Sequence, residues 1–467
     1  MISQQTLRQV CLAGGGHKVA QVAGQTRTVD QLRQQVVSLA ATLAARQEQR
    51  WALWLTSPYE FLSAFLALEL AGKDSVLPGN MQQGTARLLA PHVDGIISRQ
   101  AFQGLDCPRL EPDQEPATEI TPSNKFMASA SRDMRITLFT SGSTGEPQAI
   151  AKRLSLLEAE LHMQQRQWHS VVAQAPVLAT VSHQHIYGLL HAVLWPFLRG
   201  APFVDEICQY PEELAATAEQ LAPVVLVSSP THLARLPQVP VFAGGTGVFR
   251  AVFSSGGLLD TESALALSEL LGQAAIEILG STETGGVAWR RQSLEPSSQH
   301  WRALPGVELS CDAASGCLAV RAPHLDVEHV RSMGAYVMGD RVTFHGDGSF
   351  VLQGRADRLV KVEGKRLSIT EMERRLQTSE LVCAARIAVV KGKREEVGAV
   401  IVLSEAGRQT LARDGKRPLN KQIGNELLTW FERPLLPRRW RYVAELPYNS
   451  QGKLTADELE RILQREV

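Results

Sequence analysis

Residues 136–147 decide the fold, and they read Ile136-Thr137-Leu138-Phe139-Thr140-Ser141-Gly142-Ser143-Thr144-Gly145-Glu146-Pro147. An apolar strand runs here into a loop with four hydroxyl side chains and two glycines. Glycine lets backbone N–H groups turn toward an anion, and the hydroxyl groups add further donors. The stretch therefore predicts a polyphosphate-binding loop, with an ordinary polar turn as the alternative. It is not a Walker A loop, because no Gly-Lys-Ser/Thr follows, and a P-loop kinase is excluded on that ground.

Short apolar runs alternate with helical patterns on both sides of this loop. The runs that predict buried strands are residues 51–55, 177–181, 224–227 and 251–253. Asp30 is expected to cap a helix with the apolar face Leu32, Val36, Leu39 and Leu43, and Ser57-Pro58 to open a second helix that closes at Gly72. Strands separated by helices indicate βαβ units with largely parallel sheets.

The chain predicts two domains. Its 467 residues exceed the ~250–300 at which a single core stops growing. The alternation of strands and helices ends after Asp340, where residues 342–344 and 350–352 predict a hairpin. Residues 355–467 carry a net charge of +7 and the rest a net charge of −7. We therefore predict an α/β protein with a large domain of βαβ-layered mixed sheets at residues 1–354 and a small α+β domain at residues 355–467.

Composition excludes several classes of protein. Lys plus Arg equals Asp plus Glu at 48 each, which argues against a nucleic-acid-coating protein or one that binds an anionic membrane. The six cysteines form no CxxC pattern, so a disulfide framework or a structural zinc site is not expected. No apolar run reaches the ~20 residues of a membrane helix. The first residues lack a secretory signal, and we expect a cytoplasmic protein without a membrane span.

Four further stretches follow the loop along the chain, and each combines glycine with hydroxyl-bearing or charged residues. They are Ile278-Leu279-Gly280-Ser281-Thr282-Glu283, Tyr336-Val337-Met338-Gly339-Asp340, the segment from Gly354-Arg355-Ala356-Asp357 through Lys361 to Leu367, and Leu446-Pro447-Tyr448-Asn449-Ser450-Gln451-Gly452-Lys453-Leu454. Together with the loop, these four stretches resemble the motifs of the adenylate-forming superfamily, which includes acyl-CoA synthetases, nonribosomal adenylation domains and luciferases. Residues 185–189, 229–233 and 254–259 resemble further motifs of this superfamily more weakly.

The resemblance implies an AMP-forming acid–thiol ligase of the acyl-CoA synthetase type. Such an enzyme uses ATP to convert a carboxylic acid into an acyl-adenylate, and a thiol then captures the acyl group as a thioester. Because a carboxylate and a triphosphate repel each other, cations must neutralise the charge that develops. ATP, Mg²⁺ and either CoA or the phosphopantetheine of an acyl carrier protein are the expected cofactors and acceptors.

The resemblance also assigns roles in the large domain. The β- and γ-phosphates would bind to the loop residues Thr140, Ser141, Gly142, Ser143, Thr144 and Gly145. Glu283 would hold Mg²⁺, which takes one or two carboxylates plus phosphate oxygens, and Thr282 would donate to the α-phosphate. Gly256, Leu279 and Gly280 would lie at the nucleotide, with Leu279 where the family usually has an aromatic that stacks on adenine.

The remaining roles fall near the domain boundary and in the small domain. Asp340 would accept hydrogen bonds from the ribose hydroxyls, and Arg355 and Lys361 would lie at the nucleotide. Asp357 would be the hinge about which the small domain rotates between the two half-reactions. Lys453 would reach both the carboxylate and the α-phosphate as a long ammonium side chain.

The substrate is expected to be a fatty or aryl acid. His185 stands where the family often has a histidine or aromatic at the acyl pocket. His183 and His185 are either a pair near Tyr187 that binds an aromatic hydroxyl or two core histidines. No acidic residue for an amino group appears at Val181-Ser182-His183. Gln148 replaces the usual lysine after the loop, and Lys152 or Arg153 would have to compensate. A weakened relative that binds nucleotide or acyl groups as a scaffold or sensor is the alternative.

Overall fold

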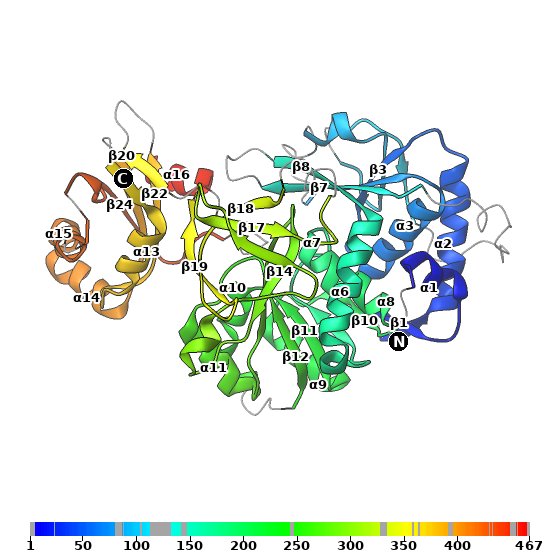
Figure 1. Ribbon diagram of the computed structural model, residues 1–467, viewed down its shortest axis with the longest axis horizontal. Coiled ribbons are helices and arrows are strands. Elements are labelled where there is room, and N and C mark those ends of the chain that lie inside the picture. Colours follow the sequence, from blue (N-terminus) through cyan, green and yellow to red (C-terminus); the bar gives the residue numbers. More distant parts are fainter. Residues whose placement is uncertain are drawn as a thin grey trace. The chain divides into compact units, whose positions relative to one another are not determined.

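The structure is a computed structural model that divides into two compact units, described separately below (Figure 1). The residues it describes are 5–22, 24–79, 86, 88–102, 105–112, 132–141, 147–242, 247–326, 334–356, 359–362, 365–390, 396–428, 430–431, 433–448, 454 and 456–464. The first unit runs to Thr140 and includes Pro147–Leu309 and Val320–Tyr336, while the second includes Ser310–Ala319 and the chain from Val337 onward. The boundary between residues 354 and 355 therefore falls within the second unit and stays a prediction.

The first unit contains a six-stranded sheet in the order β6-β5-β3-β4-β7-β8. Its strands are β3 (Arg50–Trp54), β4 (Asp74–Leu77), β5 (Gly95–Ser98), β6 (Arg109–Leu110), β7 (Arg135–Ser141) and β8 (Pro147–Arg153). The pairs β3–β4, β3–β5, β4–β7 and β5–β6 are parallel, as the alternation of strands and helices predicted.

A nine-stranded sheet in the same unit has the order β15-β14-β13-β12-β11-β9-β10-β1-β2. Its strands are β1 (Lys18–Val22), β2 (Gln25–Thr28), β9 (Val177–Ala179), β10 (Phe203–Ile207), β11 (Val224–Ser228), β12 (Phe249–Ser254), β13 (Ile276–Ser281), β14 (Gly285–Arg290) and β15 (Arg302–Ala303). The pairs β9–β11, β11–β12 and β12–β13 are parallel, so their carboxyl ends and the loops that follow meet at one edge.

Helices supply the apolar faces that complete the first core. They are α1 (Leu7–Ala13), α2 (Val29–Ala44), α3 (Pro58–Leu70), α6 (Leu154–Val172), α7 (Ile186–Gly188), α8 (Trp195–Leu198), α9 (Pro211–Leu221), α10 (Pro230–Leu233) and α11 (Thr261–Leu271). A short π-helix spans Leu189–Leu194, and 3-10 turns span Ala90–His92, Leu236–Gln238, Pro240–Phe242 and Pro296–Gln299. Buried side chains from α9 and α11 pack against β11 and β12 in one apolar cluster.

The predicted cap of α2 was wrong by two residues. Thr28, not Asp30, is the N-cap, because its hydroxyl accepts the Gln31 N–H while the Gln31 side chain accepts the Thr28 N–H. Asp30 instead accepts the N–H of Gly15 at 2.9 Å. The second predicted helix is confirmed, with Ser57 as its cap and Pro58 in its first turn.

The second unit holds the smaller sheets. A four-stranded sheet, most of whose residues belong to this unit, consists of β16 (Glu308–Cys311), β17 (Cys317–Arg321), β18 (Tyr336–Phe344) and β19 (Phe350–Arg355). The predicted hairpin is the antiparallel β18–β19 pair. Beyond it lie β20 (Leu359–Val362), β21 (Lys365–Ser368), β22 (Val382–Val390), β23 (Glu396–Leu403) and β24 (Arg439–Val443).

The helices described beside these strands are α13 (Ile369–Gln377), α14 (Glu405–Asp414), α15 (Lys416–Leu427) and α16 (Ala456–Gln464), with a 3-10 turn at Arg433–Leu435. Ser368 caps α13 and accepts the Glu371 N–H. The apolar sides of α13 and α15 share a buried cluster with β22 and β23. Throughout the described ranges, every helix is too short or too polar to cross a bilayer.

Candidate active site

The hairpin of β13 and β14 carries Thr282 and Glu283 at its tip. Thr284 accepts the Ser281 N–H through Oγ1 at 3.1 Å, and its own N–H donates to the Ser281 hydroxyl at 3.2 Å. A Cβ on Gly280 would lie 2.3 Å from the Gly285 carbonyl oxygen, so the two strands can meet this closely only at a glycine. The closed turn holds the half-buried Thr282 and Glu283 in a defined position.

The base of the same hairpin is fixed by a buried ion pair. Glu277 on β13 bonds Arg290 on β14, with Oε1 to Nε at 2.9 Å, and both side chains are largely buried. Gln292 donates a further hydrogen bond to the Glu277 carboxylate at 2.6 Å. Because these contacts satisfy the buried charges, the hairpin is anchored at the end opposite to Glu283.

The loop after β12 lies beside β13 and leaves space at Gly256. The Ser255 hydroxyl donates to the Ile278 carbonyl at 2.9 Å, which brings this loop next to the half-buried Leu279. Gly256 has a φ of +88°, and a Cβ on it would meet no atom within 4 Å. The structure therefore brings Gly256, Leu279 and Gly280 close together at the carboxyl ends of β12 and β13.

His185 lies beside the strand that enters the phosphate loop. A Cβ on Gly79, just beyond β4, would lie 3.4 Å from the His185 ring and 3.0 Å from the carbonyl oxygen of Phe139. Phe139 directly precedes Thr140 in β7. The half-buried His185 therefore lies near Phe139 in β7.

His183 does not pair with His185 in a pocket and is a core residue. Its ring is 2% exposed, its Nε2 hydrogen-bonds the Leu55 carbonyl at 2.8 Å, and it packs on Phe61. Burial lowers the pKa of His183 to about 4. The ring is therefore neutral at physiological pH, and it ties the loop after β9 to the end of β3.

Asp340 and Arg355 face each other within the second unit. They are paired across β18 and β19, with 3.8 Å between Asp340 Oδ2 and Arg355 Nη1. A Cβ on Gly339 would lie 2.8 Å from Arg355 Nη2, so the adjacent glycine leaves room for the guanidinium. The structure brings together the two residues predicted to bind the ribose and phosphate region.

The other predicted residues are placed only in part. Gly142, Ser143, Thr144 and Gly145, the hinge residue Asp357 and Lys453 lie outside the described residues. The structure places only the backbones of Thr140 and Ser141 in β7 and of Lys361 in β20. Among the described residues there is no group of three or more potential metal ligands. The Glu283 side chain offers one half-buried carboxylate, and Mg²⁺ takes one or two carboxylates together with phosphate oxygens.

The cations expected to replace the lysine missing at Gln148 have other contacts. Gln148 is exposed, and Arg153 donates to the Asp133 carbonyl at 3.3 Å. Lys152 is 6% exposed and donates to the backbone carbonyl of Glu283 at 2.8 Å. Sequence reasoning missed this contact and also Glu160, which is 1% exposed and bonds the same hairpin. A glutamate on the apolar stripe of α6 was the available signal.

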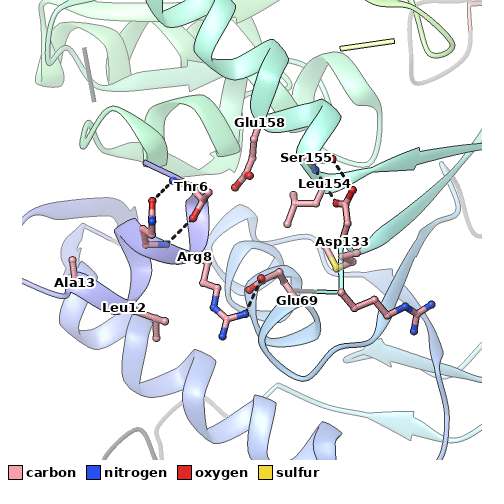
Figure 2. A pocket seen from close by; sticks show the side chains of 12 residues that line it. Thr6, Arg8, Leu12, Ala13, Glu69, Asp133, Leu154, Ser155 and Glu158 are labelled. Carbon is pink, nitrogen blue, oxygen red and sulfur yellow. Dashed lines mark hydrogen bonds and ion pairs between the residues drawn. The ribbon is translucent and has the colours of Figure 1, made fainter. Parts of the chain in front are cut away.

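A separate cavity of about 680 Å³ is lined by α1, the end of α3, and the starts of β7 and α6. Figure 2 shows the ion pair of Arg8 and Glu69 together with Glu158 on α6. None of the predicted site residues lines this cavity. Burial raises the pKa of the Glu158 carboxyl to about 7, opposed by the Leu7 N–H that it accepts and reinforced by the nearby Glu69 and Asp133 charges.

The raised pKa of Glu158 predicts that the stability of the protein depends on pH. The pKa of Glu158 is raised above the unfolded value of 4.5, so its protonated form stabilises the fold at low pH and that contribution is lost as pH rises from 4.5 to 7. Glu158→Gln keeps an acceptor for Leu7 and should raise the melting temperature at pH 8 by about 2 °C, or ~1 kcal/mol after allowance for solvent screening. The difference should shrink toward pH 5. Equal melting-temperature differences at both pH values would show that Glu158 does not titrate in this range.

Comparison with known proteins gives a consistent assignment. The model of the AMP-binding enzyme family matches residues 80–314. A 4-coumarate–CoA ligase of Halorhodospira halophila is 27% identical over 68% of this chain and 74% of its own length. A D-alanine–D-alanyl carrier protein ligase of Staphylococcus aureus is 25% identical over 71% and 72%.

The fold matches as well. ATP-bound MatB from Rhodopseudomonas palustris superposes with a TM-score of 0.79 at 20% identity and covers 98% of both chains. The predicted α/β class is thereby confirmed. Because the family model matches half of the chain, the protein belongs to the family of AMP-binding enzymes, the adenylate-forming ligases that use ATP.

Proposed function

We propose that this protein activates a carboxylic acid with ATP and transfers the acyl group to a thiol. The observation that carries the proposal is the hairpin tip with Thr282 and Glu283, which is closed and anchored next to the open position at Gly256. A half-exposed carboxylate can hold Mg²⁺ that in turn binds phosphate oxygens, and the hydroxyl beside it can donate directly to a phosphate.

The proposed reaction has two steps. A carboxylate oxygen of the acid bonds to the α-phosphorus of ATP, the bond from that phosphorus to the bridging oxygen breaks, and pyrophosphate leaves. The sulfur of the thiol then bonds to the carbonyl carbon, the bond from that carbon to the AMP oxygen breaks, and the thiol proton is released with AMP.

Residues of this chain bind and orient the groups that react. Glu283 would hold Mg²⁺, which supplies positive charge to the phosphate oxygens when bound. Thr282 would donate to the α-phosphate, Asp340 would accept from the ribose hydroxyls, and Lys453 would bridge the carboxylate and the α-phosphate. His185 would lie between the acid and the loop residues 140–145.

The acid is proposed to be a fatty or aryl acid, with an aryl acid as the first choice. The name of one relative, a 4-coumarate–CoA ligase, supports an aryl acid and CoA. The other named relative acts on D-alanine and a carrier protein. Residues 181–183 offer no carboxylate for an amino group, which argues against an amino acid here, whereas a carrier protein stays a candidate acceptor beside CoA.

A screen of pyrophosphate exchange into ATP tests this function. Aryl, fatty and amino acids are supplied one at a time, and acids that support exchange are then offered CoA or a phosphopantetheinylated carrier protein. We expect acid-dependent exchange and thioester formation with one class of acceptor. A protein that binds ATP but shows no exchange with any acid would instead be the scaffold or sensor that Gln148 and Leu279 make the second candidate.

Asp340→Asn should raise the KM for ATP about 10-fold, equivalent to ~1.4 kcal/mol, because the amide accepts a ribose hydroxyl less strongly than the carboxylate does. The melting temperature should change little, since the partner Arg355 is half-exposed and its ion pair with Asp340 is long. With 2′,3′-dideoxy-ATP the difference between the two proteins should disappear. A penalty of the same size with the dideoxy nucleotide would contradict the ribose assignment.

A further inference from the structure

The turn that carries Glu283 is held from behind by a buried lysine. Lys152 near the end of β8 is 6% exposed, and its Nζ donates to the backbone carbonyl of Glu283 at 2.8 Å, across 131 residues of sequence. A buried ammonium is costly unless it is hydrogen-bonded, so this contact is a specific one. It fixes the peptide of the residue whose side chain is proposed to bind Mg²⁺.

A buried glutamate holds the other side of the same turn. Glu160 on α6 is 1% exposed, and its Oε1 accepts the Gly286 N–H at 2.7 Å. A Cβ on Gly285 would lie 2.2 Å from Glu160 Oε2, and Gly285 has a φ of +68°. Since only glycine allows this approach, the first residue of β14 is matched to the carboxylate behind it.

His324 completes the surroundings of the two charges. It is 1% exposed, and its ring lies against the backbone of Thr284 and Gly286 in the hairpin. Burial lowers the pKa of His324, the Lys152 charge adds to this effect, and the Glu160 charge and these two backbone groups oppose it. Burial lowers the pKa of Lys152, and the Glu160 and Glu283 charges oppose this effect. Lys152 and Glu160 are each bonded to the hairpin backbone.

These contacts bracket the turn, because Lys152 bonds residue 283 and Glu160 bonds residue 286. We propose that Lys152 and Glu160 are positioning residues that hold the Thr282–Glu283 turn in the orientation its metal and phosphate contacts require, an inference that rests on the function proposed above. Residues that orient a metal ligand from behind typically change metal affinity or activity 10- to 100-fold when they are removed.

The test compares Lys152→Met with a matched control in the same unit. Lys73 is also a buried lysine, 5% exposed, and its Nζ donates to a backbone carbonyl, that of Arg46, at 2.7 Å. Lys152→Met and Lys73→Met each remove a buried ammonium group that donates to a backbone carbonyl, but only Lys152 donates to the hairpin. Calorimetric titration measures the affinity for MgATP and for ATP with EDTA, and exchange kinetics measure kcat and the KM for the acid.

We expect Lys152→Met to weaken MgATP binding about 10-fold and to lower kcat by 10- to 100-fold, with little change in ATP binding in EDTA or in the KM for the acid. Lys152→Arg, which keeps a donor and the charge, should recover most of the MgATP affinity. Lys73→Met should lower only the melting temperature. Equal effects of Lys152→Met and Lys73→Met on MgATP binding, or a change in melting temperature alone for Lys152→Met, would overturn the inference.

A double variant and the activity of the wild-type protein complete the test. Should Lys152→Met not fold, the double variant Lys152→Met/Glu160→Gln removes both buried charges, which a core tolerates better than one unpaired charge. The same weakening of MgATP binding is expected for this variant, and unchanged binding would contradict the inference. A wild-type protein that binds MgATP but activates no acid would refute the proposed function alone, because the binding comparison still decides the role of Lys152.

Discussion

Lys453→Ala should lower acid-dependent pyrophosphate exchange by about 10²- to 10³-fold, the usual loss when one preorganised donor is removed from a developing charge. The ammonium is proposed to bridge the acid carboxylate and the α-phosphate, two anions that repel each other. Its effect should therefore appear in kcat for adenylation, with a smaller change in the KM for ATP.

The second half-reaction, the transfer to the thiol, distinguishes a role of Lys453 in adenylation from a role in both half-reactions. When synthetic acyl-adenylate and the thiol are supplied, Lys453→Ala should form thioester at nearly the wild-type rate, because that step needs no bridge between two anions. Lys421→Ala, an exposed lysine on α15, is the matched control and should leave both half-reactions unchanged. Equal losses in the two half-reactions would contradict the assignment of Lys453 to adenylation.

Glu283→Gln should lower pyrophosphate exchange by about 10²- to 10³-fold, because a neutral amide is a poor ligand for a hard divalent cation. The side chain keeps its size and the hairpin keeps its closing hydrogen bonds, which Ser281 and Thr284 make. The expected defect is therefore chemical, and the melting temperature should stay close to that of the wild type.

Titration with Mg²⁺ at fixed ATP provides the check. The variant should require at least 10-fold more Mg²⁺ to reach half of its maximal exchange rate, in line with the loss of a metal ligand. Glu269→Gln changes an exposed glutamate on α11 and should behave like the wild type. An unchanged Mg²⁺ requirement in Glu283→Gln would show that the metal is held elsewhere.

The parts of the site that are local in sequence could be predicted. The turn of residues 280–286 follows from its glycine and hydroxyl residues, and the pairing of Asp340 with Arg355 follows from the β18–β19 hairpin. The cap of α2 shows where local rules stop. Thr28 and Asp30 are both good capping residues, and Asp30 is occupied by the distant Gly15 N–H, a contact that the helical pattern does not contain.

Contacts between distant segments could not be predicted. The sequence shows that Lys152 follows the loop but not that its ammonium reaches residue 283, because that depends on how β8 and the hairpin pack. Glu160 interrupts the apolar stripe of α6, which indicates that it has a buried partner but not which residue that partner is. His183 and His185 are two residues apart, yet one is a neutral core residue and the other lies next to Gly79.

A carboxylate oxygen of the acid is proposed to attack the α-phosphorus of ATP at this site. This step is tested with an acid labelled with 18O in both carboxylate oxygens, which the wild-type protein converts to the thioester, and by mass spectrometry of the AMP released. AMP should carry one 18O atom from the acid, and Glu283→Gln and Lys453→Ala should form this labelled AMP far more slowly. AMP released without the label while thioester accumulates would contradict it.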